Sequence, residues 1–90
     1  MGYHVELSEK AVKALEKMRR KDKLSWGAVV GHLKNLESEP SYYGKPLKER
    51  LAGLWSYRTV KLRIIYEVQE AKKIVFVVTI GPRRNVYEKL

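Results

Sequence analysis

The side chains that could do chemistry in this 90-residue chain are mostly basic or phenolic. There are 19 Lys and Arg and six Tyr, but only two His and no Cys. The absence of Cys removes thiolate ligands and thiol nucleophiles, and His4 and His32 lack the close spacing of a metal-binding pair. Asp22 is the only aspartate, which disfavours a Ser-His-Asp triad, and there is no glycine-rich nucleotide loop. We therefore expect no metal and no other cofactor, and a site made of Arg, Lys and Tyr.

Arg63 is the most informative of these residues. It lies within Leu62–Tyr66, where the surrounding apolar residues predict a strand. A guanidinium group in such a setting needs either an internal carboxylate or an anion from outside. Glu67 falls on the same face of the strand, so an ion pair is one interpretation. The other is an anion site to which Arg58 and Arg83, expected at the ends of the two neighbouring strands, contribute.

A cluster of fixed guanidinium groups is suited to phosphoryl chemistry. It would stabilise the extra negative charge of a pentacovalent phosphorane more than that of the ground state. Because arginine is not a base at neutral pH, proton transfer would fall to Tyr87, to Lys61 or to the substrate's own 2′-hydroxyl. An alternative role for Tyr87 is to anchor the C-terminal tail to the core.

The positive charge is concentrated in the second half of the chain. The formal net charge is +9, and residues 46–90 carry ten basic and four acidic side chains. No acidic residue falls between Glu49 and Glu67. A surface of this kind attracts polyanions such as nucleic acid or an acidic protein segment. The alternative interpretation is a solubilising surface or that of a heat-adapted protein.

The first half of the chain predicts a strand followed by two helices. Tyr3–Leu7 alternates apolar and polar residues, as a strand does. Ser8 suits the N-cap of a helix over Glu9–Lys21, which carries one apolar stripe. Ser25 is the expected N-cap of a second helix, and Pro40 its end, followed by a turn-rich loop over Ser41–Pro46.

The second half predicts three strands. Leu54–Val60 contains the first, Leu62–Gln69 is the second, and Lys73–Ile80 is a nearly continuous apolar strand that Gly81 and Pro82 end. Asn85 is expected to cap a last short turn over Val86–Leu90. The order β-α-α-β-β-β predicts an α+β fold, in which an antiparallel β-sheet meander with an N-terminal strand carries a two-helix hairpin on one face.

The length and hydropathy predict a single domain over residues 1–90, located in the cytoplasm. The longest unbroken apolar stretch is Ile74–Val78, far below the roughly 20 residues of a spanning helix. The N-terminus does not resemble a signal peptide, because Glu6, Glu9 and Lys10 interrupt any apolar segment. We therefore expect no membrane partner.

Three stretches in this order resemble the RelE/ParE superfamily of toxins from type II toxin–antitoxin systems. They are Leu51–Arg58, Leu62–Val68 and Ile80–Tyr87. The resemblance implies a compact α+β domain in which two helices pack on an antiparallel sheet. RelE-like members are ribosome-dependent endoribonucleases that cut mRNA in the A site by 2′-hydroxyl attack.

The resemblance also implies roles for individual residues. Arg63 matches the arginine that holds the scissile phosphate, and Arg83 the one that stabilises charge on the leaving oxygen. Tyr87 matches a tyrosine that orients or stacks on the nucleotide, and Arg58 a basic position in the preceding strand. Lys48, Lys61 and Arg84 are further basic candidates for RNA contacts.

The chain departs from the family pattern at four positions. Ser56 replaces a basic residue, Val60 and Leu62 replace a Gly and a Tyr, and Pro82 replaces a histidine. These departures bear on the efficiency of cleavage. ParE-like members inhibit DNA gyrase without nuclease activity, so a gyrase inhibitor is one alternative function. A degenerate domain that only binds an antitoxin or RNA is another.

The resemblance implies two kinds of partner. One is the ribosome with its mRNA and rRNA. The other is a cognate RelB-like antitoxin, partly disordered when free, whose acidic amphipathic segment would be steered by the basic surface. Apolar residues between the helices and the sheet edge are the expected docking grooves.

Overall fold

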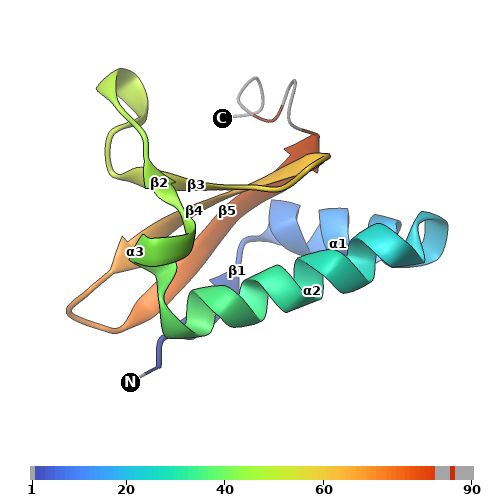
Figure 1. Ribbon diagram of the computed structural model, residues 1–90, viewed down its shortest axis with the longest axis horizontal. Helices are drawn as coiled ribbons and strands as arrows, with labels where there is room; N and C mark the ends of the chain where they lie inside the picture. Colours follow the sequence, from blue (N-terminus) through green and yellow to red (C-terminus); the bar gives the residue numbers. More distant parts are fainter. Residues whose placement is uncertain (1, 83–85, 87–90) are drawn as a thin grey trace.

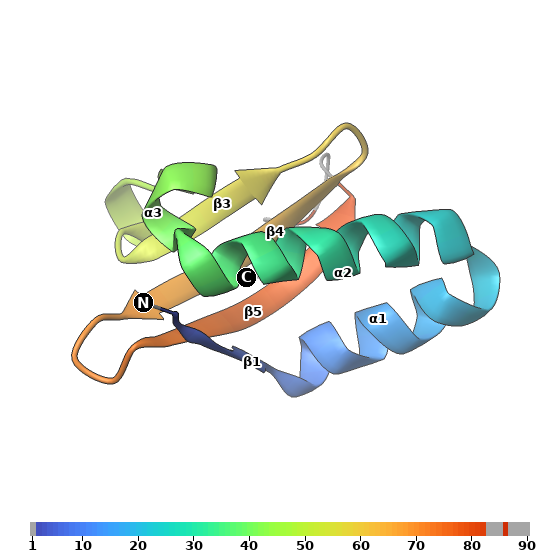
Figure 2. The same cartoon turned by 60° about the horizontal axis from the view of Figure 1, so that its bottom comes forward.

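A computed structural model describes residues 2–82 and 86. In this part of the chain, a five-stranded sheet in the order β1-β5-β4-β3-β2 carries helices α1 and α2 on one face (Figures 1 and 2). The elements are β1 (His4–Leu7), α1 (Glu9–Lys21), α2 (Lys23–Ser38), α3 (Pro40–Tyr43), β2 (Lys45–Pro46), the 3-10 turn η1 (Glu49–Leu51), β3 (Leu54–Arg58), β4 (Leu62–Gln69) and β5 (Ile74–Pro82). The predicted α+β architecture is confirmed.

Helix α1 begins where the sequence predicts. Ser8 is its N-cap, and the Ser8 hydroxyl accepts a hydrogen bond from the Ala11 amide at 3.0 Å. The same hydroxyl donates to the carbonyl of Val78 in β5 at 2.6 Å. Glu9 in the first turn and three basic residues in the last turn complement the helix dipole. One residue therefore caps α1 and fixes it to the sheet.

Helix α2 begins three residues earlier than predicted, because Asp22 rather than Ser25 is its N-cap. The Asp22 carboxylate accepts hydrogen bonds from the Ser25 amide at 3.2 Å and the Ser25 hydroxyl at 2.7 Å. These bonds, the side-chain one foremost, hold the pKa of Asp22 below its ordinary value. Ser25 thus lies inside the helix and supports the cap instead of forming it.

The second helix ends before Pro40, as predicted, but the prediction of a turn-rich loop over Ser41–Pro46 is wrong. Helix α2 ends at Ser38, and Pro40 begins α3, where the missing amide of a proline costs nothing. The buried Tyr66 hydroxyl donates to the Pro40 carbonyl at 2.6 Å, and burial raises the pKa of Tyr66 above its ordinary value. Gly44, at the end of α3, packs so closely on Tyr66 that an added Cβ would overlap the hydroxyl.

The sheet is mixed, with an antiparallel part and one parallel pair. Strands β3, β4 and β5 form the predicted antiparallel meander, and β2 adds to the edge of β3. The N-terminal strand β1 lies parallel to β5 at the other edge of the sheet. Gly81 and Pro82 do not end the last strand, because Pro82 still pairs with Leu62.

A β-bulge connects the sheet to α1. Ile65 pairs with Thr79 and Tyr66 with Val77, so Val78 is an extra residue on β5. The Val78 carbonyl is the group that binds the Ser8 hydroxyl. The bulge therefore supplies the acceptor that anchors the start of α1.

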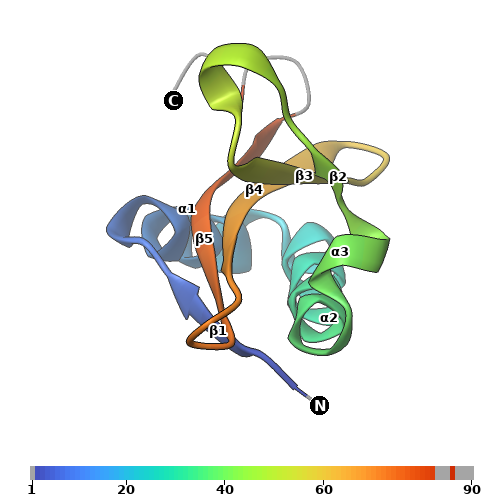
Figure 3. The same cartoon turned by 90° about the vertical axis from the view of Figure 1, so that its left-hand side faces the viewer.

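The core lies between the helices and one face of the sheet. On β4, Ile64 and Tyr66 are fully buried against it, and Leu62 and Val68 pack at its margin, as the alternation predicts. Other core residues come from the helices and β5, namely Ala11, Val29, Leu36, Val75, Val77 and Ile80. Figure 3 shows the segment with η1 rising on the opposite face of the sheet, away from α1 and α2.

The predicted C-terminal turn over Val86–Leu90, capped by Asn85, lies outside the described residues except for Val86, which is buried beside Gly81. None of the helices in the described part of the chain combines the length and apolar character needed to cross a membrane.

We predict that Gly44→Ala destabilises the protein. The added methyl would overlap the buried Tyr66 hydroxyl, and overpacking of this kind costs about 1–3 kcal/mol in the free energy of unfolding. Gly31→Ala is the matched control, because its Cβ would meet open space within α2 and alanine favours a helix. Urea unfolding of both variants measures the difference, and equal stability would contradict the close packing of Gly44.

Candidate functional site

A basic cleft lies on the face of the sheet away from the core. It has a volume of about 840 Å³. The described residues that line it are Tyr43, Lys45, Pro46, Leu47, Ser56, Arg58, Thr59, Val60 and Arg63. Three of them are cationic, and none of the described lining residues carries a carboxylate. The cleft therefore presents a positive surface to solvent.

Two arginines face each other across neighbouring strands in this cleft. Arg58 of β3 pairs directly with Arg63 of β4. The preceding pair, Tyr57 and Ile64, points into the core, so both arginines project from the opposite face. Like charges in directly opposed positions are destabilising. An anion between them would relieve this repulsion.

A third cation comes from the edge of the sheet. Lys45 of β2 pairs with Ser56 of β3, two residues before Arg58, and all three side chains line the cleft. Three neighbouring strands therefore each contribute a basic residue. The predicted cations came from β3, β4 and the end of β5, so the contribution of β2 was not predicted. On β5 the partner of Arg63 is Gly81, which has no side chain to offer.

The predicted internal partner of Arg63, Glu67, lies four residues further along β4. That spacing corresponds to about 13 Å along the strand. The Glu67 carboxylate accepts a hydrogen bond from the Gln69 amide group at 2.8 Å. Arg63 itself is half-buried, whereas Arg58 is exposed.

Tyr43 contributes an aromatic ring to the wall of the cleft. Tyr43 of α3 stacks on Tyr57 with ring centroids 5.7 Å apart and planes 8° from parallel. The Tyr57 hydroxyl accepts from the Asn35 side chain at 3.1 Å and lies 3.0 Å from Nδ1 of His32. Tyr43 is therefore supported from helix α2 through Tyr57.

Ser56 brings a buried polar group to the cleft. Its side chain is only 7% exposed, and its hydroxyl finds no hydrogen-bond partner among the described residues. Such a group carries a desolvation cost unless a ligand binds it. In the family resemblance Ser56 is a departure from a basic position, and no role for its hydroxyl was predicted.

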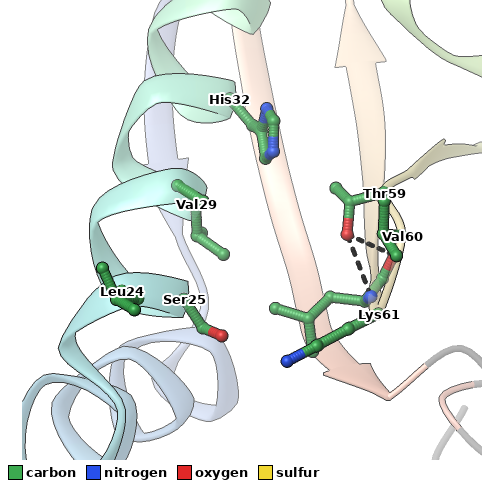
Figure 4. Close-up of a pocket in the computed structure, with 9 residues that line it drawn as sticks. Leu24, Ser25, Val29, His32, Thr59, Val60 and Lys61 are labelled. Atoms are coloured by element: carbon green, nitrogen blue, oxygen red, sulfur yellow. Dashed lines mark hydrogen bonds between the residues drawn. The ribbon is translucent and has the colours of Figure 1, made fainter.

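The remaining predicted site residues fall in different places. Lys61 lines a second pocket of about 250 Å³ between α2 and the β3–β4 turn (Figure 4), which shares Thr59 and Val60 with the cleft. There its charge contributes to lowering the pKa of Asp22, although less than the Ser25 hydrogen bonds do. Lys48 is exposed beside the cleft-lining Leu47 but does not line the cleft. Arg83, Arg84 and Tyr87 lie outside the described residues.

The pocket containing Lys61 is mainly apolar. Leu24, Ala28, Val29, Val60 and Leu62 line it together with His32 and the polar groups of Ser25, Thr59 and Lys61. Leu24 is 89% exposed and Val60 is 87% exposed, so two large apolar side chains of this pocket face solvent. Figure 4 shows Leu24 and Ser25 on the helix side and Thr59, Val60 and Lys61 on the turn. We call this pocket the apolar groove.

The comparisons with known proteins identify the family. Residues 5–87 match a family described as the ParE toxin of type II toxin–antitoxin system, parDE. The chain belongs to this toxin family. Its predicted membership of the RelE/ParE superfamily is therefore confirmed.

The chain is also similar to individual toxins and solved structures. Over 55 residues the chain is 31% identical to Toxin RelG of Mycobacterium tuberculosis, a match that spans 61% of this chain and 63% of that protein. The crystal structure of the RelBE2 toxin–antitoxin complex from the same organism superposes with a TM-score of 0.83 and 28% identity, covering 92% of this chain and 100% of that one. The archaeal RelE of a RelE–RelB complex from Pyrococcus horikoshii superposes with a TM-score of 0.72 and 24% identity, over 96% and 100% of the two chains.

We predict that acidification destabilises the toxin through His32. Burial holds the pKa of His32 below its ordinary value of about 6.5. Nδ1 of the neutral ring can accept a hydrogen bond from the Tyr57 hydroxyl. Because the unfolded chain then binds a proton more readily than the folded one, the free energy of unfolding should fall as the pH drops below about 6.5. Urea unfolding at pH 7.5 and 5.5 measures this effect. His32→Gln should reduce the dependence, and an unchanged pH dependence in that variant would contradict the assignment.

Proposed function

We propose that this toxin is a RelE-like endoribonuclease that cleaves mRNA in the ribosomal A site. The observation that supports this most is the pairing of Arg58 with Arg63 in a cleft that also contains Lys45. Such an arrangement suits the negatively charged phosphodiester of RNA, because guanidinium groups match phosphate oxygens in geometry. The superposition on RelE-type toxins is consistent with the proposal.

The proposed reaction needs no cofactor. The 2′-oxygen attacks the adjacent phosphorus, the bond to the 5′-oxygen breaks, and a cyclic phosphate remains. Arg63 would bind the non-bridging oxygens, whose negative charge grows in the pentacovalent transition state. The 2′-hydroxyl loses a proton and the 5′-oxygen gains one. We assign these proton movements to solvent or substrate groups, with Tyr87 orienting the nucleotide.

Arg83 is proposed to stabilise charge on the leaving oxygen. Strand β5 runs to Pro82, which pairs with Leu62, the residue next to Arg63. Pro82 therefore lies at the same end of the sheet as Arg63. Pro82 cannot transfer protons, so this part of the site would act by charge alone. Lys48 and Arg84 are proposed to contact RNA outside the reacting centre.

The proposed partners are the ribosome with its mRNA and a cognate antitoxin, met in the cytoplasm. Structures of related toxins with RelB antitoxins support the second partner. The apolar groove is the proposed docking site for part of the antitoxin. Its exposed Leu24 and Val60 would receive apolar side chains, while Lys61 at its edge would attract acidic ones.

A second candidate function is inhibition of DNA gyrase. The family that the chain matches is described as the ParE toxin, and this description favours the alternative. A supercoiling assay with purified gyrase separates the two functions. A gyrase inhibitor would block supercoiling and leave mRNA on programmed ribosomes intact, whereas the proposed nuclease would do the reverse.

We predict that Arg63→Gln lowers cleavage of mRNA on programmed ribosomes by about 100-fold or more. The loss of one preorganised charge at a transition state typically has an effect of this size. Toe-printing on ribosomes with a defined A-site codon measures it, and growth arrest on expression should be relieved in parallel. Arg83→Gln should act in the same direction.

The matched control for this prediction is Arg20→Gln, on the exposed surface of α1. It removes the same charge from the molecule without touching the cleft. If Arg63→Gln and Arg20→Gln cleaved equally well, the assignment of the phosphate site would be wrong.

We also predict that Leu24→Glu weakens antitoxin binding without abolishing toxicity. The substitution places a carboxylate at the edge of the apolar groove, where it would repel an acidic segment and remove an apolar contact. Calorimetric titration with the cognate antitoxin measures the change, expected to be about 10-fold in Kd. Val12→Glu, on α1 outside the groove, is the control, and an equal effect of both variants would argue against this docking site.

A further inference from the structure

We propose that Tyr43 and Ser56 form a nucleotide subsite within the basic cleft. In this subsite the base of a bound RNA stacks on the Tyr43 ring, and the same nucleotide hydrogen-bonds to the Ser56 hydroxyl. The inference rests on the proposed function, because it takes the ligand of the cleft to be RNA. It adds two residues that position the substrate beside the cations.

The first observation is the place of Tyr43. It lines the cleft together with Lys45, Arg58 and Arg63, and 37% of its surface remains exposed. Single-stranded nucleic acids are commonly bound by cations that hold the backbone and aromatic rings that stack on bases. Tyr43 is the only aromatic residue among the described residues that line the cleft, so it is the ring that a base could use there.

The second observation is that Tyr43 is already packed against a neighbouring ring without a ligand. Its ring is already stacked on Tyr57, so a base would extend an existing stack. Helix α3, which carries it, is fixed by the hydrogen bond from Tyr66 to the Pro40 carbonyl and by the close packing of Gly44. A preorganised ring loses little conformational entropy on binding, which favours affinity.

The third observation is the buried hydroxyl of Ser56. Ser56 lines the same cleft, and only 7% of the residue is exposed. Its hydroxyl nevertheless has no hydrogen-bond partner among the described residues. In a folded protein such groups are few and call for an explanation. A nucleotide in the cleft would supply the missing partner.

The test measures binding of two probes to the intact toxin. One is a fluorescent single-stranded RNA oligomer that is fully 2′-O-methylated and so cannot be cleaved by 2′-hydroxyl attack. The other is inorganic polyphosphate, which carries charge but no bases. Tyr43→Leu should weaken binding of the RNA about 10-fold, which is about 1.4 kcal/mol, while Tyr43→Phe stays within about 2-fold of the wild type. Polyphosphate binding should change in neither variant.

Ser56→Ala separates the subsite from a structural role. Removing an unsatisfied buried hydroxyl should leave the protein as stable as before, or more stable, in urea unfolding. RNA binding should nevertheless weaken about 5-fold. Tyr42→Leu is the control for Tyr43, because Tyr42 lies on the same helix and is 76% exposed but does not line the cleft.

The outcomes distinguish this inference from the proposed function. If Tyr43→Leu and Ser56→Ala bound RNA like the wild type, or lost RNA and polyphosphate equally, the subsite would be wrong while the cation cluster stood. If Arg63→Gln bound both probes like the wild type, the cation cluster itself would be wrong. Binding of polyphosphate but not RNA by the wild-type toxin would also overturn the subsite.

Discussion

The register between β3 and β4 is the constraint on which the candidate site depends. Tyr57 pairs with Ile64, and burial of both against the helices decides which face of each strand points inward. The next pair, Arg58 and Arg63, must then project together from the other face. A slip of one residue in either strand would move core side chains into solvent and a guanidinium group into the core. Hydrophobic burial on one face therefore holds two like charges together on the other.

The corner where α2, α3 and β2 follow one another supplies the cleft-lining residues Tyr43 and Lys45. Helix α3 turns the chain from the helical layer toward the sheet edge, as Figures 1 and 3 show. The Tyr66 hydroxyl and Gly44 fix that corner from inside the core, so Tyr43 and Lys45 reach the cleft from a firmly packed segment. Core packing and the candidate site are coupled at this point, because Tyr66 also stacks on Trp55 in β3.

The sequence predicted the elements whose determinants are local. Ser8 is both the predicted and the observed N-cap of α1, and the alternation over Leu62–Gln69 predicts both the bounds and the faces of β4. The errors arose where two local interpretations compete. Asp22 and Ser25 are both good caps, and the carboxylate, which accepts two bonds from Ser25, forms the cap. Pro40 is compatible with the end of one helix and the start of another, and both occur here.

The candidate site could be predicted only in part, and the reason is sequence separation. Arg58 and Arg63 are joined by a short turn, so alternation alone brings them to one face. Lys45 reaches them only because a two-residue strand pairs with β3, and so short a strand has no periodicity to detect. Lys61 lies in the turn between the arginines, yet it lines the apolar groove on the helix side. Lys61 is therefore close to both arginines in sequence but does not line the cleft, whereas Lys45 lines it through a long-range strand pairing. In a basic chain of this kind, the net positive charge predicts an anionic ligand. The strand register decides which of the basic side chains line the binding site.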